Sequence, residues 1–199
     1  MSLSLVAISA SPSENSKTAK LVDYVLENRV GDVATCTHIR LRDLDAAALL
    51  SGRPQDDPKL ELAIQQIEQA DALVIATPIF KAAYTGLLKS FLDILPQFGL
   101  AGKVILPLAT GGSIAHVLAL DYALRPVLQS LGARHIVQSF FLCETDVNIT
   151  DQRLVIAESA RAHLDETIYH FICSMNTPAL DVLLGHPRPN RAKDPELAH

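Results

Sequence analysis

The stretch that decides the fold runs from Leu3-Ser4-Leu5-Val6-Ala7-Ile8 into Ser9-Ala10-Ser11-Pro12-Ser13-Glu14-Asn15-Ser16-Lys17-Thr18. The first part is short and almost wholly apolar, which is typical of a strand covered on both faces in a parallel sheet. The second part is rich in polar residues and suits a loop, after which Ser16 or Asn15 can cap a helix. This stretch therefore predicts a strand, a polar loop and a helix in succession.

The same alternation of apolar strands and amphipathic helices repeats along the chain. Further strands are predicted near Val33 to Leu41, Ala72 to Ala76, Val104 to Leu108 and His135 to Leu142. Helices are predicted from Ser16 to Gly31, from Asp57 with Leu60, Leu62, Ile64 and Ile67 on its buried side, from Leu87 to Pro96, from Ile114 to Leu131 and from Leu154 to Ile172. Such an order packs most economically as a doubly wound parallel α/β sheet with helices on both faces.

Length and composition indicate one globular domain. The chain has 199 residues, of which 49% are apolar, enough for one sizeable core. We expect the domain to span residues 1–175. The segment 176–199 contains Pro178, Pro187, Pro189 and Pro195 among polar residues, so we expect neither a strand nor a long helix there. It is either a disordered tail or an arm that packs on another subunit.

Charge and cysteine content narrow the class of function. The formal net charge of −5 predicts no nucleic-acid partner, and no apolar stretch reaches the length of a membrane span. No export signal is recognisable, so we expect a cytoplasmic protein that acts on small molecules. Cys36, Cys143 and Cys173 are widely spaced, and we interpret them as buried thiols rather than metal ligands.

The first loop, Ser9 to Thr18, has features of a phosphate site. Several hydroxyls and the free N–H groups of a helix start can enclose a phosphate. The loop is neither GxxxxGK[ST] nor GxGxxG, which argues against a di- or triphosphate site and favours one terminal monophosphate. An ordinary surface turn with a capping residue remains the alternative.

Two more loops follow strands at the edge where ligands bind in such sheets. The second loop, Thr77-Pro78-Ile79-Phe80-Lys81-Ala82-Ala83-Tyr84-Thr85-Gly86, combines a rigid proline with an aromatic residue and could form a wall against a flat ring. The third loop, Ala109-Thr110-Gly111-Gly112-Ser113, has paired glycines that allow backbone N–H groups to approach a ligand edge. A plain turn is the alternative for the third loop.

Taken together, the three loops resemble those of the NADPH-dependent FMN reductase family, over roughly Leu3 to Phe141. The resemblance implies a flavodoxin-like fold with five parallel strands in the order 2-1-3-4-5, FMN and NADPH as cofactors, and hydride transfer without a dedicated acid or base. It places Ser11, Ser16, Lys17 and Thr18 on the FMN phosphate, Pro78, Ile79, Phe80 and Lys81 along the isoalloxazine ring, and Thr110, Gly111, Gly112 and Ser113 at the other edge of the ring. The first loop departs from the family pattern at Ala10, where glycine is usual, and at Ser13, where arginine is common.

Two stretches give a narrower resemblance, to the flavin reductases of two-component alkanesulfonate monooxygenases. These are Lys103-Val104-x-Leu106-Pro107-Leu108-Ala109-Thr110-Gly111-Gly112 and Leu120-Asp121-Tyr122-Ala123-Leu124-Arg125-Pro126. The resemblance implies that Tyr122 bulges its helix into a π-turn at a homo-oligomer interface, in a dimer or tetramer, and takes part in flavin exchange. It also implies that the reduced flavin leaves to serve a partner monooxygenase. The alternative for Tyr122 is a tyrosine packed in an ordinary helix.

Other functions on the same fold stay open from the sequence. A quinone or azo-compound reductase would keep FMN bound and pass electrons to an organic acceptor. A flavodoxin-type electron carrier would hold FMN without oxidising a nicotinamide. The sequence does not decide between NADPH and NADH, because no cluster of Arg or Lys is tied to a 2′-phosphate.

Overall fold

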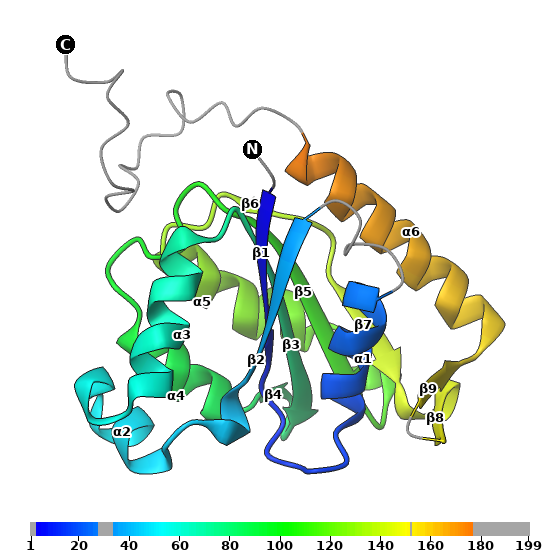
Figure 1. The fold of residues 1–199 in the computed structure, drawn as a ribbon. Helices are drawn as coiled ribbons and strands as arrows, with labels where there is room; N and C mark the ends of the chain where they lie inside the picture. Colours follow the sequence, from blue (N-terminus) through cyan, green and yellow to red (C-terminus); the bar gives the residue numbers. More distant parts are fainter. Residues whose placement is uncertain (1–2, 28–33, 152, 177–199) are drawn as a thin grey trace.

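The computed structural model describes residues 3–27, 34–151 and 153–176. Figure 1 shows a twisted central sheet with helices on both sides. The strands are β1 (Leu3–Ser9), β2 (Ala34–Arg40), β3 (Ala72–Phe80), β4 (Ala83–Tyr84), β5 (Val104–Gly111), β6 (His135–Ile136) and β7 (Phe140–Cys143). The parallel order is β2-β1-β3-β5, followed by β6 and β7, which both pair with β5. With the short antiparallel β4 left out and β6 and β7 counted as one divided fifth strand, this order corresponds to the predicted 2-1-3-4-5, so the flavodoxin-like fold class is confirmed.

Helices cover the two faces of the sheet unequally (Figure 1). One face carries α1 (Lys17–Val25) and α6 (Glu158–Met175), and the other carries α3 (Pro58–Gln69), α4 (Gly86–Ile94) and α5 (Arg125–Ser130). A short helix, α2 (Ala46–Ser51), lies beside α4. Helix α2 was not predicted from the sequence, because six residues are too few to show a helical period.

Alternate residues of the central strands fill two cores. In β1, Leu5 and Ala7 belong to the core under α1 and α6, whereas Val6 and Ile8 belong to the core under α3, α4 and α5. All four side chains are at most 2% exposed. Each fully buried large apolar side chain contributes about 1.5–3 kcal/mol. The continuous apolar run in the sequence is thus explained by burial on both faces.

The predicted last strand and last helix differ from the structure. The strand expected over His135 to Leu142 is divided into β6 and β7. The helix expected from Leu154 begins only at Glu158, because Arg153–Ile156 forms β9, which pairs antiparallel with β8 (Val147–Thr150). Leu154 and Ile156 alternate with more exposed neighbours, as a strand requires, and the run is too short for periodicity to separate strand from helix.

The predicted helix over Ile114 to Leu131 is not continuous. It consists of a 3₁₀ turn over Ile114–His116, a π-helical turn over Leu120–Leu124, and α5. Pro126 has no N–H to donate to the carbonyl four residues earlier, which favours a widened turn at this point. The π-turn around Tyr122 that the resemblance implied is therefore present.

Two predictions of burial are wrong. Leu62 is 53% exposed, because it lies about 200° around the α3 axis from Leu60, whose side chain is buried. Among the cysteines, Cys36 and Cys143 are half-buried and Cys173 is exposed, so the interpretation as buried thiols fails most clearly for Cys173. The predicted stop at Gly31 lies outside the described residues, as does the predicted tail 176–199 apart from Asn176.

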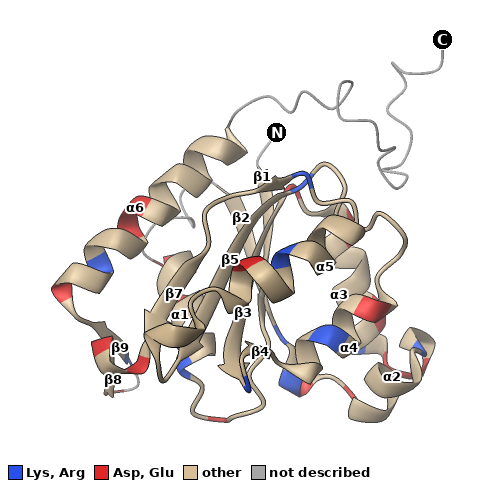
Figure 2. Ribbon diagram, turned by 180° about the vertical axis from the view of Figure 1, so that it is seen from behind, with Lys and Arg blue, Asp and Glu red and all other residues tan. Residues whose placement is uncertain are grey.

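The described surface mixes charges of both signs. Figure 2 shows basic and acidic residues interspersed over the helices rather than gathered on one of them. In the described ranges, no helix combines the length and apolarity needed to cross a bilayer. The same residues contain no group of three or more His, Cys, Asp or Glu side chains arranged to hold a metal ion.

Candidate functional site

The three predicted loops lie at one edge of the sheet, where β1, β3 and β5 end (the lower edge in Figure 1). The strands set their spacing, because β3 pairs with β1 on one side and with β5 on the other. The register places Ser9 beside Ala76, and Pro78 beside Thr110. The ends of three neighbouring strands thus meet where a doubly wound sheet binds its ligand.

The first loop presents buried hydroxyls. Ser11, Ser16 and Thr18 are only 7%, 4% and 2% exposed. Ser16 caps α1, since its Oγ accepts a hydrogen bond of 2.9 Å from the N–H of Ala19. Lys17 is half-buried, and its Nζ lies 3.6 Å from Oε2 of Glu144. The loop therefore combines a capped helix N-terminus with a nearby cation, which suits a monophosphate.

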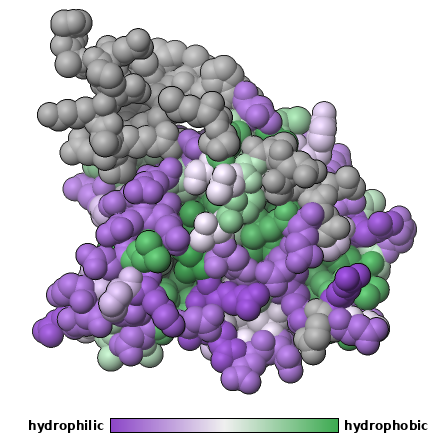
Figure 3. Space-filling model, viewed as in Figure 1, coloured by the Kyte–Doolittle hydropathy of each residue, from purple (hydrophilic) through white to green (hydrophobic). Residues whose placement is uncertain are grey.

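A cavity of about 120 Å³ borders the first loop. Its walls include four serines and the side chains of two arginines, namely Ser9, Ser11, Ser13, Ser16, Arg40 and Arg42. The arginines are already engaged, Arg40 with Asp23 at 3.2 Å and Arg42 with Glu14 at 3.1 Å. Hydrophilic residues dominate the lower edge of the face in Figure 3, where this loop lies.

The second loop is a tight β-hairpin rather than an irregular segment. Strand β3 continues through Thr77 to Phe80 and turns back into β4, with Phe80 opposite Ala83. Lys81 and Ala82 form the turn with φ of 52° and 65°, a left-handed conformation that costs a non-glycine residue about 1–2 kcal/mol. This turn holds Phe80 at the surface with 54% of its area exposed. Ile79, by contrast, is buried in the core, so its side chain is not exposed beside Phe80.

The two glycines of the third loop differ in their surroundings. A Cβ on Gly111 would lie 2.8 Å from Cζ of Phe141, so this glycine makes room for a packed ring. A Cβ on Gly112 would meet no heavy atom within 4 Å. Ser113, exposed beside it, accepts a hydrogen bond of 3.3 Å from the N–H of Ala115. Gly112 is therefore the position at which a ligand can approach the backbone closely.

Hydrogen bonds join the three loops into one site. Thr18 Oγ1 and Thr110 Oγ1 are 2.7 Å apart, which links the first loop to the third. Thr85 Oγ1 donates to the carbonyl of Ala10 at 2.9 Å, which links the second loop to the first. Thr77 Oγ1 accepts from the N–H of Thr85 at 3.2 Å. The role of Thr85 was not predicted from the sequence, although its place before Gly86, at the start of a helix, is typical of an N-cap.

Apolar side chains surround the open side of the second and third loops. Phe80, Ile114, Val117, Leu118 and Tyr122 are five of the ten large apolar side chains that are exposed in the described chain. They belong to two adjacent segments, because β4 lies against the π-turn. A flat aromatic ligand, or a second protein surface, would cover part of this apolar rim.

The residues present fit FMN. The buried hydroxyls and helix N-terminus suit its phosphate, the open space at Gly112 suits close approach of the backbone to a ring edge, and the exposed Phe80 suits contact with a flat ring. Ser11, Ser16, Lys17 and Thr18 occur together in the first loop, and Thr110 is brought to Thr18. The roles of individual residues stay predictions.

The fold and this site define a flavin-dependent oxidoreductase of the flavodoxin-like class. The sequence pattern of the NADPH-dependent FMN reductases matches residues 3–147. The chain belongs to the NADPH-dependent FMN reductase family. Its cofactors are FMN and NADPH, and membership excludes the simple electron carrier among the alternatives.

Individual relatives agree with this assignment. The chain is 39% identical over 167 residues to FMN reductase (NADPH) of Escherichia coli (strain K12), covering 84% of this chain and 87% of the relative. It is 34% identical to the NADH-dependent FMN reductase SfnF of Pseudomonas fluorescens (strain Pf0-1), covering 72% and 78%. The apo structure of the NADH:FMN oxidoreductase EMOB superimposes with a TM-score of 0.83 at 51% identity, covering 94% of this chain and 97% of EMOB. All three relatives are named for FMN, whereas the nicotinamide nucleotide in their names is NADPH in one and NADH in the other two.

Proposed function

We propose that this enzyme transfers a hydride from NADPH to FMN held by the three loops, and that the reduced FMN then leaves to serve a partner monooxygenase of the alkanesulfonate type in sulfur assimilation. The observation that carries the proposal is the contrast between the two ends of the site. Hydroxyls at the phosphate end are buried, whereas Phe80 and Ile114 at the ring end are 54% and 65% exposed. Such a site would bind the phosphate of FMN in buried surroundings and leave the isoalloxazine ring accessible.

The phosphate end supplies specificity for a mononucleotide. Ser11 and Thr18 offer hydroxyls, and the first N–H groups of α1 add a partial positive charge that favours an anion. Lys17 adds a full charge, which its partner Glu144 offsets in part across 3.6 Å. Because riboflavin lacks the phosphate, these groups distinguish FMN from riboflavin.

The ring end orients two flat molecules against each other. FMN, when bound, supplies the N5 atom that accepts a hydride. The residues Phe80, Gly112 and Ser113 provide an apolar contact, an unobstructed backbone and a polar edge. The protein lowers the barrier by binding and orientation, which can contribute several kcal/mol without an acid or base.

Two observations support release to a partner: the openness of the ring end and the narrower resemblance at Leu120 to Pro126. A prosthetic flavin is normally enclosed, because burial of its ring contributes to retention. Here, apolar side chains lie exposed around the site. We include in this proposal that the enzyme is a homo-oligomer whose interface contains Tyr122, which is 79% exposed in the single chain.

A steady-state assay tests the proposed function. Purified protein should oxidise NADPH only when FMN is added, and the reduced flavin should pass through a membrane that retains the protein. Comparing NADPH with NADH, and FMN with FAD and riboflavin, identifies the preferred pair. Flavin that co-purifies and stays bound on a desalting column, with electrons passing to quinones or azo dyes, would favour the alternative reductase. No oxidation of either nicotinamide would refute both.

A further inference from the structure

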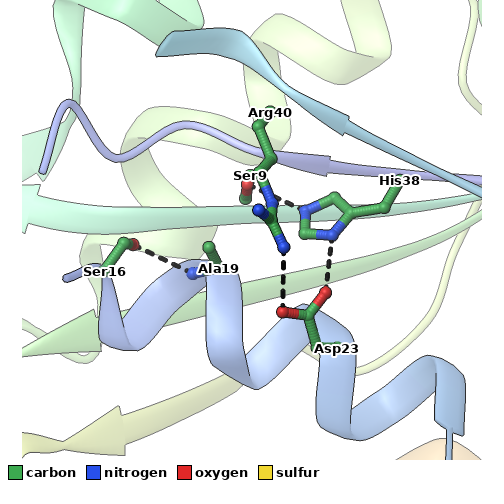
Figure 4. Close-up of polar contacts among 6 residues, drawn as sticks. All are labelled: Ser9, Ser16, Ala19, Asp23, His38 and Arg40. Atoms are coloured by element: carbon green, nitrogen blue, oxygen red, sulfur yellow. Dashed lines mark hydrogen bonds and ion pairs between the residues drawn. The ribbon is translucent and has the colours of Figure 1, made fainter. Parts of the chain in front are cut away.

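A histidine on β2 bridges the two segments that flank the first loop (Figure 4). His38 Nε2 lies 2.9 Å from Oγ of Ser9, the last residue of β1. His38 Nδ1 lies 2.8 Å from Oδ1 of Asp23, on α1. The first loop connects the end of β1 at Ser9 to the start of α1 at Lys17. A single imidazole is therefore hydrogen-bonded to both elements that flank this loop.

The chemistry of the partners fixes the proton positions. A carboxylate only accepts, so Nδ1 of His38 carries a proton and donates it to Asp23. In the neutral ring, Nε2 then accepts, and the hydroxyl of Ser9 donates to it. Ser9 is 2% exposed, so this hydrogen bond is shielded from water. The hydroxyl proton of Ser9 is thus directed to His38 rather than to a ligand.

The surroundings keep His38 neutral near pH 7. Burial lowers the pKa of His38 below its ordinary value, and Arg40 on the same strand lowers it further. The hydrogen bond to Asp23, and more weakly the charge of Asp43, oppose this decrease. Arg40 also donates to Oδ2 of Asp23 at 3.2 Å, so both carboxylate oxygens are occupied and the acceptor for Nδ1 is fixed in place.

The bridge determines where the start of α1 lies relative to β1. Ser16 and Thr18, at that start, are buried against the strand ends, and Asp23 lies on the same helix, less than two turns from Thr18. A hydrogen bond to Asp23 therefore restrains the helix whose N-terminus faces the phosphate site. Restraint of a binding loop in its bound shape increases affinity, because less conformational entropy is lost on binding.

We propose that His38 is a positioning residue that orders the first loop for a phosphate monoester, so that it raises affinity for FMN but not for riboflavin. This inference rests on the proposed function and adds to it a residue outside the three loops. His38 faces Ser9 and Asp23 and does not belong to the loops that would contact the ring. Its effect should therefore appear in the discrimination between flavins that do and do not carry a phosphate.

Equilibrium titrations of the full chain with FMN and with riboflavin, followed by flavin fluorescence, test the proposal. His38→Ala should raise the Kd for FMN roughly tenfold, which corresponds to about 1.4 kcal/mol, and leave the Kd for riboflavin within about twofold. Ser9→Ala removes one of the two bonds and should give a smaller change in the same direction. Asp23→Asn keeps an oxygen that can accept from Nδ1 and should retain FMN affinity better than Asp23→Ala.

The matched control is His135→Ala, an exposed histidine on the short strand β6, at the opposite end of β5 from the site. It should leave both dissociation constants unchanged. Equal loss of FMN and riboflavin affinity in His38→Ala would show a purely structural role and overturn the proposal, as would unchanged FMN affinity. Wild-type protein that binds neither flavin would instead refute the proposed function. Urea unfolding of each variant identifies any that fails to fold, in which case Ser9→Ala decides the outcome.

Discussion

Thr18 Oγ1 and Thr110 Oγ1 lie 2.7 Å apart, and this contact joins the start of α1 to the end of β5. The two residues are 92 positions apart in sequence and only 2% and 3% exposed. One hydroxyl donates to the other, and this buried hydrogen bond holds the proposed phosphate end and the proposed ring end of the site at a fixed separation. A mononucleotide with its ring at a set distance from its phosphate needs such a constraint.

Valine substitutions at Thr18 and Thr110 should affect the free energy of unfolding and the affinity for FMN differently. Thr18→Val or Thr110→Val alone leaves one buried hydroxyl without its partner and should lower the free energy of unfolding by about 1–3 kcal/mol. The double variant removes both polar groups at nearly constant shape and should recover most of that loss. FMN affinity should fall in all three variants, because each loses the hydrogen bond between the proposed phosphate end and the proposed ring end of the site.

Urea unfolding and FMN titration measure the two effects. Thr35→Val, at an exposed position on β2, is the matched control and should change neither. A double variant less stable than either single variant would contradict the hydrogen bond between the two hydroxyls. Unchanged FMN affinity in the double variant would remove both residues from the proposed site.

The adjacent glycines Gly111 and Gly112 should respond differently to alanine. Gly111→Ala should destabilise the fold by about 1 kcal/mol or more, because its Cβ would press on the ring of Phe141 at 2.8 Å. Gly112→Ala should alter stability by no more than about 0.5 kcal/mol, since its Cβ meets open space. It should nevertheless lower FMN affinity, because that space is where the ring edge is expected. Retention of full FMN affinity in Gly112→Ala would show that the ring lies elsewhere.

The free energy of unfolding should decrease as the pH is lowered, because His38 takes up a proton. Burial lowers the pKa of His38 in the folded state, whereas the unfolded chain has a value of about 6.5. The folded state therefore binds fewer protons, and its stability is complete above about pH 6.5 and decreases as the pH falls through the folded-state pKa. His38→Gln should remove this part of the pH dependence. Urea unfolding at pH 7.5 and pH 5 measures it, and an identical loss in wild type and variant would exclude His38 as its source.

The sequence was sufficient for the features that depend on local patterns. The apolar run of β1 and the polar loop after it predicted the first strand, the loop and a helix cap at Ser16 or Asn15, because each signal lies within a few residues. The structure identifies Ser16 as the cap. It was insufficient where short segments depend on their neighbours. Arg153–Ile156 is too short for its period to be read, and its pairing with β8 determines that it is a strand.

The network around His38 illustrates a second limit. Ser9, Asp23 and His38 come from three elements, and nothing in their spacing along the chain indicates that they meet. Their contact arises only once β1 and β2 pair, with Ala7 beside His38 and Ser9 beside Arg40, and α1 packs across them. The sequence identified the loops that border the site, whereas the residues that hold those loops in place required the tertiary structure.

Tyr122 should control assembly and flavin exchange rather than the stability of the single chain. It lies in the π-turn over Leu120–Leu124 and is 79% exposed, so Tyr122→Ala should alter the free energy of unfolding of the monomer by no more than about 0.5 kcal/mol. If the apolar rim is the homo-oligomer interface, loss of this exposed aromatic should shift the protein to smaller species in light scattering, because aromatic side chains contribute strongly to interfaces. The exchange of bound FMN should change with it, since Phe80 and Ile114 belong to the same rim.

Tyr169→Ala, which removes a 64% exposed tyrosine from α6, is the control and should leave oligomer size unchanged. If oligomer size and FMN exchange are both unaffected by Tyr122→Ala, the tyrosine has no role at an interface, and the apolar rim must be explained by the ring alone.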